Sequence, residues 1–404
     1  MSWEMTIIGD HCTVTSSKRF HLSERSNSGV PFYCSKEIIQ KNRGEEITDC
    51  DYISEELYLN IAEKFGVPQE NDLLVTTRGT IGVPYLYRRN DRFYFADGNL
   101  TWIKDFKETL LPHFLYYWFR THEGQKKIDA IAKGTAQKAV PIAGIITLEI
   151  SLPPVDVQRQ IADILTTYDS LIENNRKQIK LLEEAAQRLY KEWFVDLRFP
   201  GHETTPITNG LPEGWKKHKL PEIVSIMSGG TPKTDVKEYY GGSIPFYTPK
   251  DSNGLFFAFD TITHISQSGL NHCNSQYYPA DTVIITARGT VGKTTILAVP
   301  MAMNQSCYAL KCDELNSPYY LFFSLNKEVD SLKTMANGGV FNTIIVKTFD
   351  SISLTIPTQK VLSAFNAVVS SIMQQIKAKM KQNIHLAEAR DRLLPKLMSG
   401  EIEV

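Results

Sequence analysis

The sequence predicts an α+β protein with two similar domains, each mixed α/β with a strand-rich core, separated by two long helices that form an antiparallel coiled coil. Three observations predict this fold class. The chain repeats itself, a stretch of helical periodicity follows each copy of the repeat, and a segment rich in Pro and Gly separates the two halves. With 404 residues in total, each half is long enough to bury a core of its own.

Four blocks recur in the same order in the two halves of the chain. The most specific is Thr-Thr-Arg-Gly-Thr-Ile-Gly at residues 76–82, which matches Thr-Ala-Arg-Gly-Thr-Val-Gly at residues 286–292 with an offset of 210. The other matches are residues 31–33 with 245–247, Trp3 with Trp215, and Gly134 with Gly338. Two similar units on one chain indicate a molecule that binds two similar objects at a fixed distance.

The first copy of the repeat, residues 1–154, is expected to be rich in short strands. Runs of β-branched and aromatic residues separated by turn residues predict strands at 73–76, 83–87 and 93–95. Helical patterns follow at 112–120 and 124–132. The second copy, residues 215–357, has the same plan, with strands expected at 283–286, 295–299 and 308–312 and helices at 318–325 and 327–336.

A segment with the pattern of a long helix follows each copy. In residues 155–197, apolar positions from Ile161 to Trp193 recur at alternating steps of four and three, with charged residues outside them. This narrow seam favours a coiled coil over the alternative, an amphipathic helix that lies on its own domain. Residues 198–214 contain three Pro and three Gly and are interpreted as a linker, and residues 358–404 as the second helix with a C-terminal tail.

Polar residues interrupt the apolar seam of both predicted helices. Asn175 does so in the first helix, and Lys379 and Asn383 do so in the second. If the helices pair antiparallel, with residue i opposite residue 558 − i, Asn175 faces Asn383. One polar layer in an apolar seam costs stability but specifies the register. We therefore predict that Asn175 and Asn383 meet and set the register of the helix pair.

Composition limits the classes of function. The net charge of −1 does not favour nucleic-acid binding, although a local basic face can occur in a neutral protein. Six cysteines without Cys-x-x-Cys pairs or zinc-type His spacing are expected to be reduced thiols. The N-terminus lacks a signal pattern, and the longest apolar run, residues 296–303, is too short to cross a bilayer. We expect a cytoplasmic protein without membrane contact.

Gly-Lys-Thr at residues 292–294 fits a loosened phosphate-loop pattern, which would indicate a nucleotide-binding enzyme. However, Ala287 replaces the first Gly, a strand-like run follows, and the matching segment at 76–82 has no Lys. The favoured interpretation is a tight Gly turn between strands, from which Arg78 and Arg288 project. Arg suits bidentate contact with guanine or phosphate, although an Arg beside a turn is often only solvated or salt-bridged.

Segments that differ between two copies of a scaffold are expected to carry specificity. Residues 133–138 correspond to 337–342, and residues 18–25 to 231–237, with little identity. Gln and Asn suit adenine edges, though for any single residue an ordinary polar loop explains the pattern equally well. The candidate DNA-contacting residues are Lys18, Arg19, Arg78, Thr80, Lys133, Gln137, Lys138, Thr231, Lys233, Lys250, Arg288, Thr290, Lys293 and Asn342.

No catalytic centre is predicted. The Pro-Pro pair at residues 153–154 is followed by Val155 instead of the aromatic residue that a base-modifying methyltransferase needs. No Gly-x-Gly-x-x-Gly motif follows a strand, and we identify neither a nuclease-type cluster of carboxylates with Lys nor a Ser/His/Asp set. Besides the nucleotide-binding enzyme, the alternative that stays open is a coiled-coil scaffold whose globular ends bind proteins.

Several segments together resemble the specificity subunits of type I restriction-modification systems. Gln-Arg-Gln-Ile-Ala-Asp-Ile-Leu at residues 158–165 and Leu-Ile-Glu-Asn-Asn at 171–175 resemble the first conserved region of that family. Leu-Leu-Pro-Lys-Leu-Met-Ser-Gly-Glu-Ile at 393–402 resembles the end of its second conserved region. Residues 360–365 lack the Gln-Arg-x-Ile-Ala pattern, so the start of the second helix is expected to bind its partner less typically.

The resemblance implies a function and partners. Each of the two target-recognition domains would read one half of a bipartite, asymmetric target in double-stranded DNA. The helices would act as a spacer and as a docking surface for methyltransferase subunits, two per chain, and restriction-translocase subunits would join the complex. S-adenosylmethionine, ATP and Mg would belong to the partners, with no cofactor or metal in this chain. The seam spans 33 residues, about 50 Å or about 15 bp of DNA, which fits a gap of several base pairs.

Overall fold

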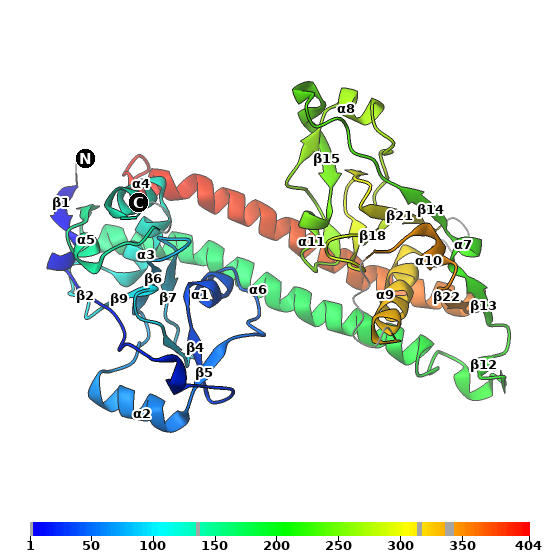
Figure 1. Ribbon diagram of the computed structural model, residues 1–404, viewed down its shortest axis with the longest axis horizontal. Helices are drawn as coiled ribbons and strands as arrows, with labels where there is room; N and C mark the ends of the chain where they lie inside the picture. The colour runs from blue at the N-terminus through cyan, green and yellow to red at the C-terminus, as the bar shows by residue number, and fades with distance from the viewer. Residues whose placement is uncertain (1–2, 135–137, 313–316, 336–342) are drawn as a thin grey trace. The chain divides into compact units, whose positions relative to one another are not determined.

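The chain divides into two units, and the division cuts both long helices. The computed structural model describes residues 3–134, 138–312, 317–335 and 343–404 (Figure 1). The first unit comprises Met1–Asn174 and Ile384–Val404, and the second unit comprises Asn175–Asn383. Each unit therefore holds one copy of the repeat together with a part of each long helix.

Two four-stranded sheets form the centre of the first unit. One has the antiparallel order β2-β9-β6-β7, and the other has the order β3-β5-β4-β8, in which β4 and β8 are parallel. A separate antiparallel pair joins β1 to β10. The strands are β1 (Glu4–Ile7), β2 (Thr13–Thr15), β3 (Arg25–Ser26), β4 (Val30–Tyr33), β5 (Asp51–Ile53), β6 (Leu73–Thr76), β7 (Pro84–Leu86), β8 (Tyr94–Phe95), β9 (Leu100–Lys104) and β10 (Glu149–Leu152). The short helices are α1 (Ser35–Asn42), α2 (Glu55–Lys64), α3 (Pro112–Arg120), α4 (His122–Ile131) and α5 (Ile142–Ile146).

The second unit repeats this arrangement with a five-stranded sheet β14-β21-β18-β19-β16 and a three-stranded sheet β17-β15-β20. The parallel pair of the first unit, β4 with β8, has its counterpart in β15 with β20, and β1 with β10 has its counterpart in β13 with β22. The strands are β11 (Ile207–Thr208), β12 (Leu211–Pro212), β13 (Lys216–Lys219), β14 (Ser225–Ser228), β15 (Tyr240–Tyr247), β16 (Phe257–Ala258), β17 (His264–Ile265), β18 (Val283–Thr286), β19 (Thr294–Leu297), β20 (Ala302–Met303), β21 (Cys307–Lys311) and β22 (Ser353–Ile356). The short helices are α7 (Leu220–Ile223), α8 (Gln267–Asn271) and α10 (Val346–Phe349), and the longer α9 spans Pro318–Met335.

The central strands β6 and β18 are buried along their whole length, which explains why they are uninterrupted runs of apolar residues and Thr. Their side chains alternate between two cores, as the period of a strand requires. Val283 and Ile285 face the larger cluster that contains α9, whereas Ile284 faces a smaller cluster on the other side of its sheet. Each repeat thus has a sheet that is covered on both faces.

The helices that follow β9 and β21 differ between the repeats. In the first unit, Thr121 separates α3 from α4, and its hydroxyl caps α4 by accepting a hydrogen bond from Gly124 N–H at 3.0 Å. At the offset of 206 that relates Pro112, the first residue of α3, to Pro318, the first residue of α9, Lys327 occupies the place of Thr121, and Lys has no capping oxygen. The prediction of two helices at 318–325 and 327–336 is therefore wrong, because α9 continues through this point as one helix.

Two helices of 40 residues each, α6 (Val155–Phe194) and α11 (Gln359–Met398), contribute to both units (Figure 1). In the second unit, Asn175 Nδ2 donates a hydrogen bond to Asn383 Oδ1 at 2.9 Å, and the ring centroids of Trp193 and Phe365 lie 5.9 Å apart. The partner's number falls as the number along α6 rises, so the two helices run in opposite directions here. The Asn175–Asn383 contact is the one that the 558 − i pairing predicts, whereas its role in setting the register stays a proposal.

In the first unit, the other ends of these helices also pack on one another. Ile161 and Leu165 of α6 lie in one buried cluster with Leu394 and Leu397 of α11. The same cluster contains residues of helix α3 and of one face of β6, so the helix pair completes the core of the first repeat. Burial of this seam against the domain stabilises the unit.

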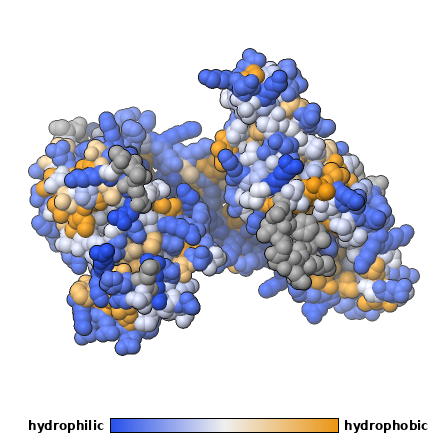
Figure 2. Space-filling model, viewed as in Figure 1, coloured by the Kyte–Doolittle hydropathy of each residue, from blue (hydrophilic) through white to orange (hydrophobic). Residues whose placement is uncertain are grey.

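The face of the molecule in Figure 2 is largely hydrophilic, with hydrophobic residues scattered over each unit. Within the part of the chain that the structure describes, no helix combines the length and the apolar composition needed to cross a bilayer.

Candidate nucleic-acid interface

One hairpin loop has the same construction in both units. We call residues 77–83 and 287–293 the Arg-Gly-Thr loops. In the first, Gly82 N–H donates to the carbonyl of Thr76 at 2.7 Å, and Val83 N–H donates to the Thr76 hydroxyl at 2.9 Å. Gly79 and Gly82 both have φ of +78°, a conformation that favours glycine. The loop therefore has a fixed shape that depends on Thr76 and two glycines.

The second Arg-Gly-Thr loop repeats these contacts. Gly292 N–H donates to the carbonyl of Thr286 at 2.8 Å, and Lys293 N–H donates to the Thr286 hydroxyl at 3.1 Å. Gly289 and Gly292 have φ of +78° and +76°. Because the fixed backbone presents the exposed Arg288 in the same way that its counterpart presents Arg78, the two arginines project from equivalent loops.

The same geometry argues against a phosphate-binding loop at residues 292–294. Such a loop leads into a helix, whose N-terminal N–H groups hold the phosphates. Here the loop leads into β19, which pairs antiparallel with β18. The Lys293 side chain is exposed on a hairpin and does not lie at the start of a helix. The structure therefore does not support the alternative of a nucleotide-binding enzyme that uses this loop.

In the first unit, the backbone at Lys133 and at Ala139–Val140 lies beside the Arg-Gly-Thr loop. Val140 N–H donates to the carbonyl of Thr77 at 2.9 Å, and Arg78 forms a β-bridge with Ala139. Lys133 pairs with Ala139 through two backbone hydrogen bonds, so it lies close to Arg78. Lys138 is also exposed here, and its ammonium forms an ion pair with Asp129 at 3.0 Å, which reduces its free positive charge. The predicted contact residue Gln137 lies outside the described residues.

In the second unit, the corresponding backbone contact is made to Ala287, the counterpart of Thr77 in the loop. Ile344 N–H donates to the carbonyl of Ala287 at 2.9 Å, in the same way that Val140 does in the first unit. Ala287 N–H donates in turn to the carbonyl of Ser306 at 2.7 Å. Gln305 precedes this serine, and its side chain is hydrogen-bonded to Thr231. Thr231 therefore lies beside the loop, whereas the predicted residue Asn342 lies outside the described residues.

Lys250 joins the same group of residues through the start of a short 3-10 helix. The Thr290 hydroxyl of the Arg-Gly-Thr loop donates to the carbonyl of Pro249 at 3.3 Å, next to Lys250. The structure thus brings Thr231, Lys250, Arg288 and Thr290 together at one end of the sheets. Lys293 lies in the same loop, and Lys233 is exposed two residues after Thr231.

Lys18 and Arg19 are not joined to this group by the contacts described. Lys18 N–H donates to the Tyr94 hydroxyl at 3.2 Å, and its ammonium lies 5.9 Å from the centre of the Phe20 ring and 5.6 Å from that of Phe65. The Lys18 ammonium thus lies over two aromatic rings, within the range of a cation–π contact. Arg19 is exposed.

Two exposed residues of this end of the sheets were not predicted. Lys36 is the counterpart of Lys250 at the offset of 214 that relates the Pro-Phe-Tyr blocks, so the repeat itself could have identified it. Lys36 lies near the Arg-Gly-Thr loop because its neighbour Ser35 is bonded there. The Ser35 hydroxyl donates to the carbonyl of Asn99, which also accepts from Thr77 N–H in that loop. The second residue is Gln305, which no repeated motif marks.

The acidic side chains at this end are held by N–H donors. Asp251 accepts hydrogen bonds from the N–H and the hydroxyl of Thr248, both at 2.8 Å, and Glu37 accepts one from Cys34 N–H at 2.9 Å. Among the described residues, no ion pair engages Arg78 or Arg288. The guanidinium groups of both Arg-Gly-Thr loops are therefore exposed cations without an ion-pair partner among the described residues.

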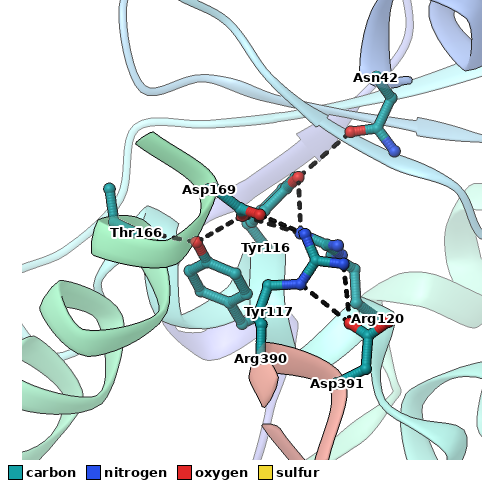
Figure 3. A network of polar contacts seen from close by, with 8 residues as sticks. All are labelled: Asn42, Tyr116, Tyr117, Arg120, Thr166, Asp169, Arg390 and Asp391. Atoms are coloured by element: carbon teal, nitrogen blue, oxygen red, sulfur yellow. Dashed lines mark hydrogen bonds and ion pairs between the residues drawn. The ribbon is translucent and has the colours of Figure 1, made fainter. Parts of the chain in front are cut away.

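A polar network attaches the first domain to the long helices (Figure 3). Asp169 of α6 accepts hydrogen bonds from the Tyr117 hydroxyl at 2.8 Å and from Arg120 of α3 at 3.0 Å, and it forms an ion pair with Arg390 of α11. Burial alone would raise the pKa of the Asp169 carboxyl, but Arg120 and Arg390 outweigh this effect and hold the pKa below its usual range. The carboxylate is thus kept charged between two cations.

Aromatic packing attaches the second domain to the same two helices. The Phe194 ring of α6 lies 4.8 Å from the Tyr320 ring of α9 and 4.8 Å from the Phe365 ring of α11, measured between centroids. Tyr190, one turn earlier, stacks on Phe323 at 5.7 Å. Edge-to-face contacts of this kind add to the free energy gained by burying the rings.

The two repeated domains with equivalent basic loops define a class of protein that presents two related binding surfaces on one chain. Residues 1–184 and 212–383 match the family described as the type I restriction modification DNA specificity domain. The chain belongs to this family.

Named relatives and solved structures agree with this assignment. The chain is similar to the type I restriction enzyme HindI specificity subunit of Haemophilus influenzae, with 25% identity over 386 residues that cover 78% of this chain and 84% of the relative. It is also similar to the MjaIX specificity subunit of Methanocaldococcus jannaschii, with 26% identity, covering 74% and 71%. The crystal structure of a type I S subunit from M. genitalium has the same fold, with a TM-score of 0.61, 16% identity and coverage of 98% and 96%.

Proposed function

We propose that this chain is the DNA sequence-recognition subunit of a type I restriction-modification complex. As a specificity subunit it is not the catalytic component, and it is required by the methyltransferase and endonuclease of the complex. Each recognition domain reads one half of a bipartite, asymmetric target in double-stranded DNA. Its partners are methyltransferase subunits, two per chain, and restriction-translocase subunits, which carry S-adenosylmethionine, ATP and Mg. The complex acts in the cytoplasm, where its DNA is.

The equivalence of the two Arg-Gly-Thr loops carries this proposal. The loops have the same glycine conformations and the same Thr-held turn, so each domain presents an Arg at the same place on its surface. Arg and Lys supply the phosphate contacts that position a protein on DNA. The segments beside the loops differ between the copies, since Lys133 lies beside the first loop and Thr231, from a non-equivalent segment, lies beside the second. Different side chains on one scaffold would read different half-sites.

The long helices are proposed to form an antiparallel coiled coil that spaces the two domains and docks the methyltransferase subunits. Their apolar seam and their length of 40 residues each support this role. Deleting one heptad from each helix is expected to change the gap between half-sites by several base pairs or to abolish binding. Methylation mapping that shows an altered half-site sequence in the shortened chain contradicts the spacer role.

The direct test is a genome-wide map of methylated adenine in cells with and without this gene. A two-part sequence that loses its methylation when the gene is deleted, and regains it when the gene is restored, is the expected result. An unchanged methylation map rejects DNA recognition and favours a protein-binding scaffold. Arg89, exposed in the first unit outside the Arg-Gly-Thr loop, offers a control, since Arg89→Ala should leave the map unchanged.

A further inference from the structure

One strongly exposed apolar side chain of the second unit lies in a turn near its candidate DNA-contacting residues. Ile262 lies in the turn between β16 and β17 and is 76% exposed. No large hydrophobic side chain among the described residues is more exposed. Isolated exposed apolar residues are common, so the position and rigidity of Ile262 decide whether it is informative.

The backbone around Ile262 is held on both sides. Ile262 N–H donates to the Asp251 carboxylate at 2.7 Å. The buried Thr261 hydroxyl accepts a hydrogen bond from Phe246 N–H at 2.9 Å and donates to the carbonyl of Thr263 at 2.7 Å. The turn is thus fixed to the end of β15, and little conformational entropy remains to be lost when Ile262 contacts a ligand.

The same carboxylate fixes the Lys250 segment. The other Asp251 oxygen accepts from Thr248, two residues before Lys250, so one side chain positions both the lysine and Ile262. Thr290 of the Arg-Gly-Thr loop binds the carbonyl of Pro249 in this segment. The backbone of Ile262 is therefore tied to the segment that carries Lys250 and contacts Thr290, which places Ile262 on the candidate DNA-contacting surface.

The place equivalent to Ile262 in the first unit holds a smaller, partly buried residue. Pro245 pairs with His264 in the second unit and Pro31 pairs with Tyr52 in the first, so Cys50 is the counterpart of Ile262. Cys50 is partly buried and packs on the aromatic cluster that contains Tyr33. The difference lies between two otherwise equivalent surfaces, which is where the two half-sites are expected to be told apart.

We propose that Ile262 reads a thymine in the half-site recognised by the second unit, by packing on its C5-methyl group. This inference rests on the proposed function. The thymine methyl is the one apolar group that base pairs present in the major groove, and apolar side chains recognise it by contact. A rigid, exposed Ile near candidate DNA-contacting side chains meets that requirement, whereas a protein partner would need a larger apolar patch.

The test uses the assembled complex of the full chain with its methyltransferase subunits and duplexes that carry the mapped target. Each thymine of the second half-site is replaced in turn by deoxyuridine, which lacks only the methyl group. At one position this replacement should weaken binding of the wild type about fourfold, the factor that corresponds to about 0.8 kcal/mol for one buried carbon. Ile262→Ala should bind the thymine duplex about fourfold more weakly and no longer respond to deoxyuridine there.

Ile207 supplies the matched control, because it is 61% exposed in the same unit but lies on the β11–β12 hairpin. Ile207→Ala should behave like the wild type on every duplex. An Ile262→Ala complex that keeps the full deoxyuridine effect overturns the inference, and so does a second half-site without thymine. Scrambling the whole second half-site distinguishes failure of the Ile262 inference from failure of the proposed function. Binding that is unchanged by scrambling rejects sequence recognition by the second unit.

Discussion

The two recognition domains are attached to the same pair of helices by different chemistry. In the first unit, Asp169 lies between Arg120 and Arg390, and each ion pair joins a different element (Figure 3). In the second, Phe194 packs between Tyr320 and Phe365. An ion-pair network depends on direction and leaves charges without partners when one member is lost, whereas rings gain free energy mainly from burial. The comparison separates a directional attachment from one that depends on buried area.

The largest effect is expected from breaking the aromatic attachment. Phe194→Ala removes a buried ring and should lower the free energy of unfolding of the second unit by about 3–5 kcal/mol. Hydrogen exchange of the full chain, resolved to α9 and α3, measures each unit by itself. Leu181→Ala is the control on the same helix, because the Leu181 side chain is 65% exposed. It should change the free energy of unfolding of the second unit by less than about 0.5 kcal/mol. Equal losses in α3 and α9 would contradict a local attachment.

A smaller effect is expected in the first unit from Asp169→Asn. The amide keeps the volume but removes the charge that Tyr117, Arg120 and Arg390 bind, which should cost about 2 kcal/mol. The loss should appear in exchange from α3 and not from α9. Asp163→Asn is the control, because Asp163 is exposed on the same helix. A stable first unit with unchanged exchange would mean that the network contributes nothing to the attachment.

The two units should also respond to pH in opposite directions. Burial raises the pKa of Glu183 to about 7, partly countered by the hydrogen bond from Phe256 N–H. A carboxyl with a raised pKa binds more protons in the folded state, so the second unit should lose stability as pH rises from about 4.5 to about 7. The pKa of Asp169 is lowered instead, so its contribution is present above its ordinary pKa and is lost as pH falls through the lower folded value.

Glu183→Gln removes the titrating group and should flatten this dependence. In thermal unfolding, the second unit of the variant should then be more stable than that of the wild type at pH 8 and equally stable near pH 4. Glu184→Gln, at the exposed neighbouring position, should keep the wild-type profile. Parallel profiles for Glu183→Gln and the wild type would show that this carboxyl is not responsible.

The smallest effect on stability is expected at the polar layer between the helices. Replacing Asn175 and Asn383 together by Leu should leave the helices folded, because two apolar side chains fill the same layer, but it should allow more than one register. Disulfide crosslinks placed along the two helices report the register. A single unchanged register in the double variant would rule out the role of the Asn pair.

Local patterns predicted much of the fold. The strand–loop–strand arrangement around both Arg-Gly-Thr loops followed from β-branched runs that flank two glycines, and the Asn175–Asn383 contact followed from polar residues in an apolar seam. The single helix α9 was not predicted, because the decisive difference is one capping hydroxyl, Thr121, that its counterpart Lys327 lacks.

Contacts between distant residues could not be predicted from the sequence. Asp169 and Arg390 are far apart along the chain, and nothing in the local pattern of either residue names the other. The positions of Gln305 and Ile262 beside the basic loops likewise depend on sheet topology. Lys36 could have been predicted from the sequence, because the offset of 214 pairs it with Lys250. Which of these residues touch DNA stays a prediction.

The division of the chain at the Asn pair has a consequence for the order of folding during synthesis. The second unit is one continuous segment, Asn175–Asn383, whose two ends are hydrogen-bonded to each other. It can fold as soon as that segment leaves the ribosome. The first unit needs Ile384–Val404, which is synthesised afterwards. Ile161 and Leu165 therefore cannot pack on Leu394 and Leu397 until the second unit has been synthesised. Folding of the second unit brings Asn175 and Asn383 together. The first unit then loses less entropy when its two chain segments come together, because the loop between them is already closed.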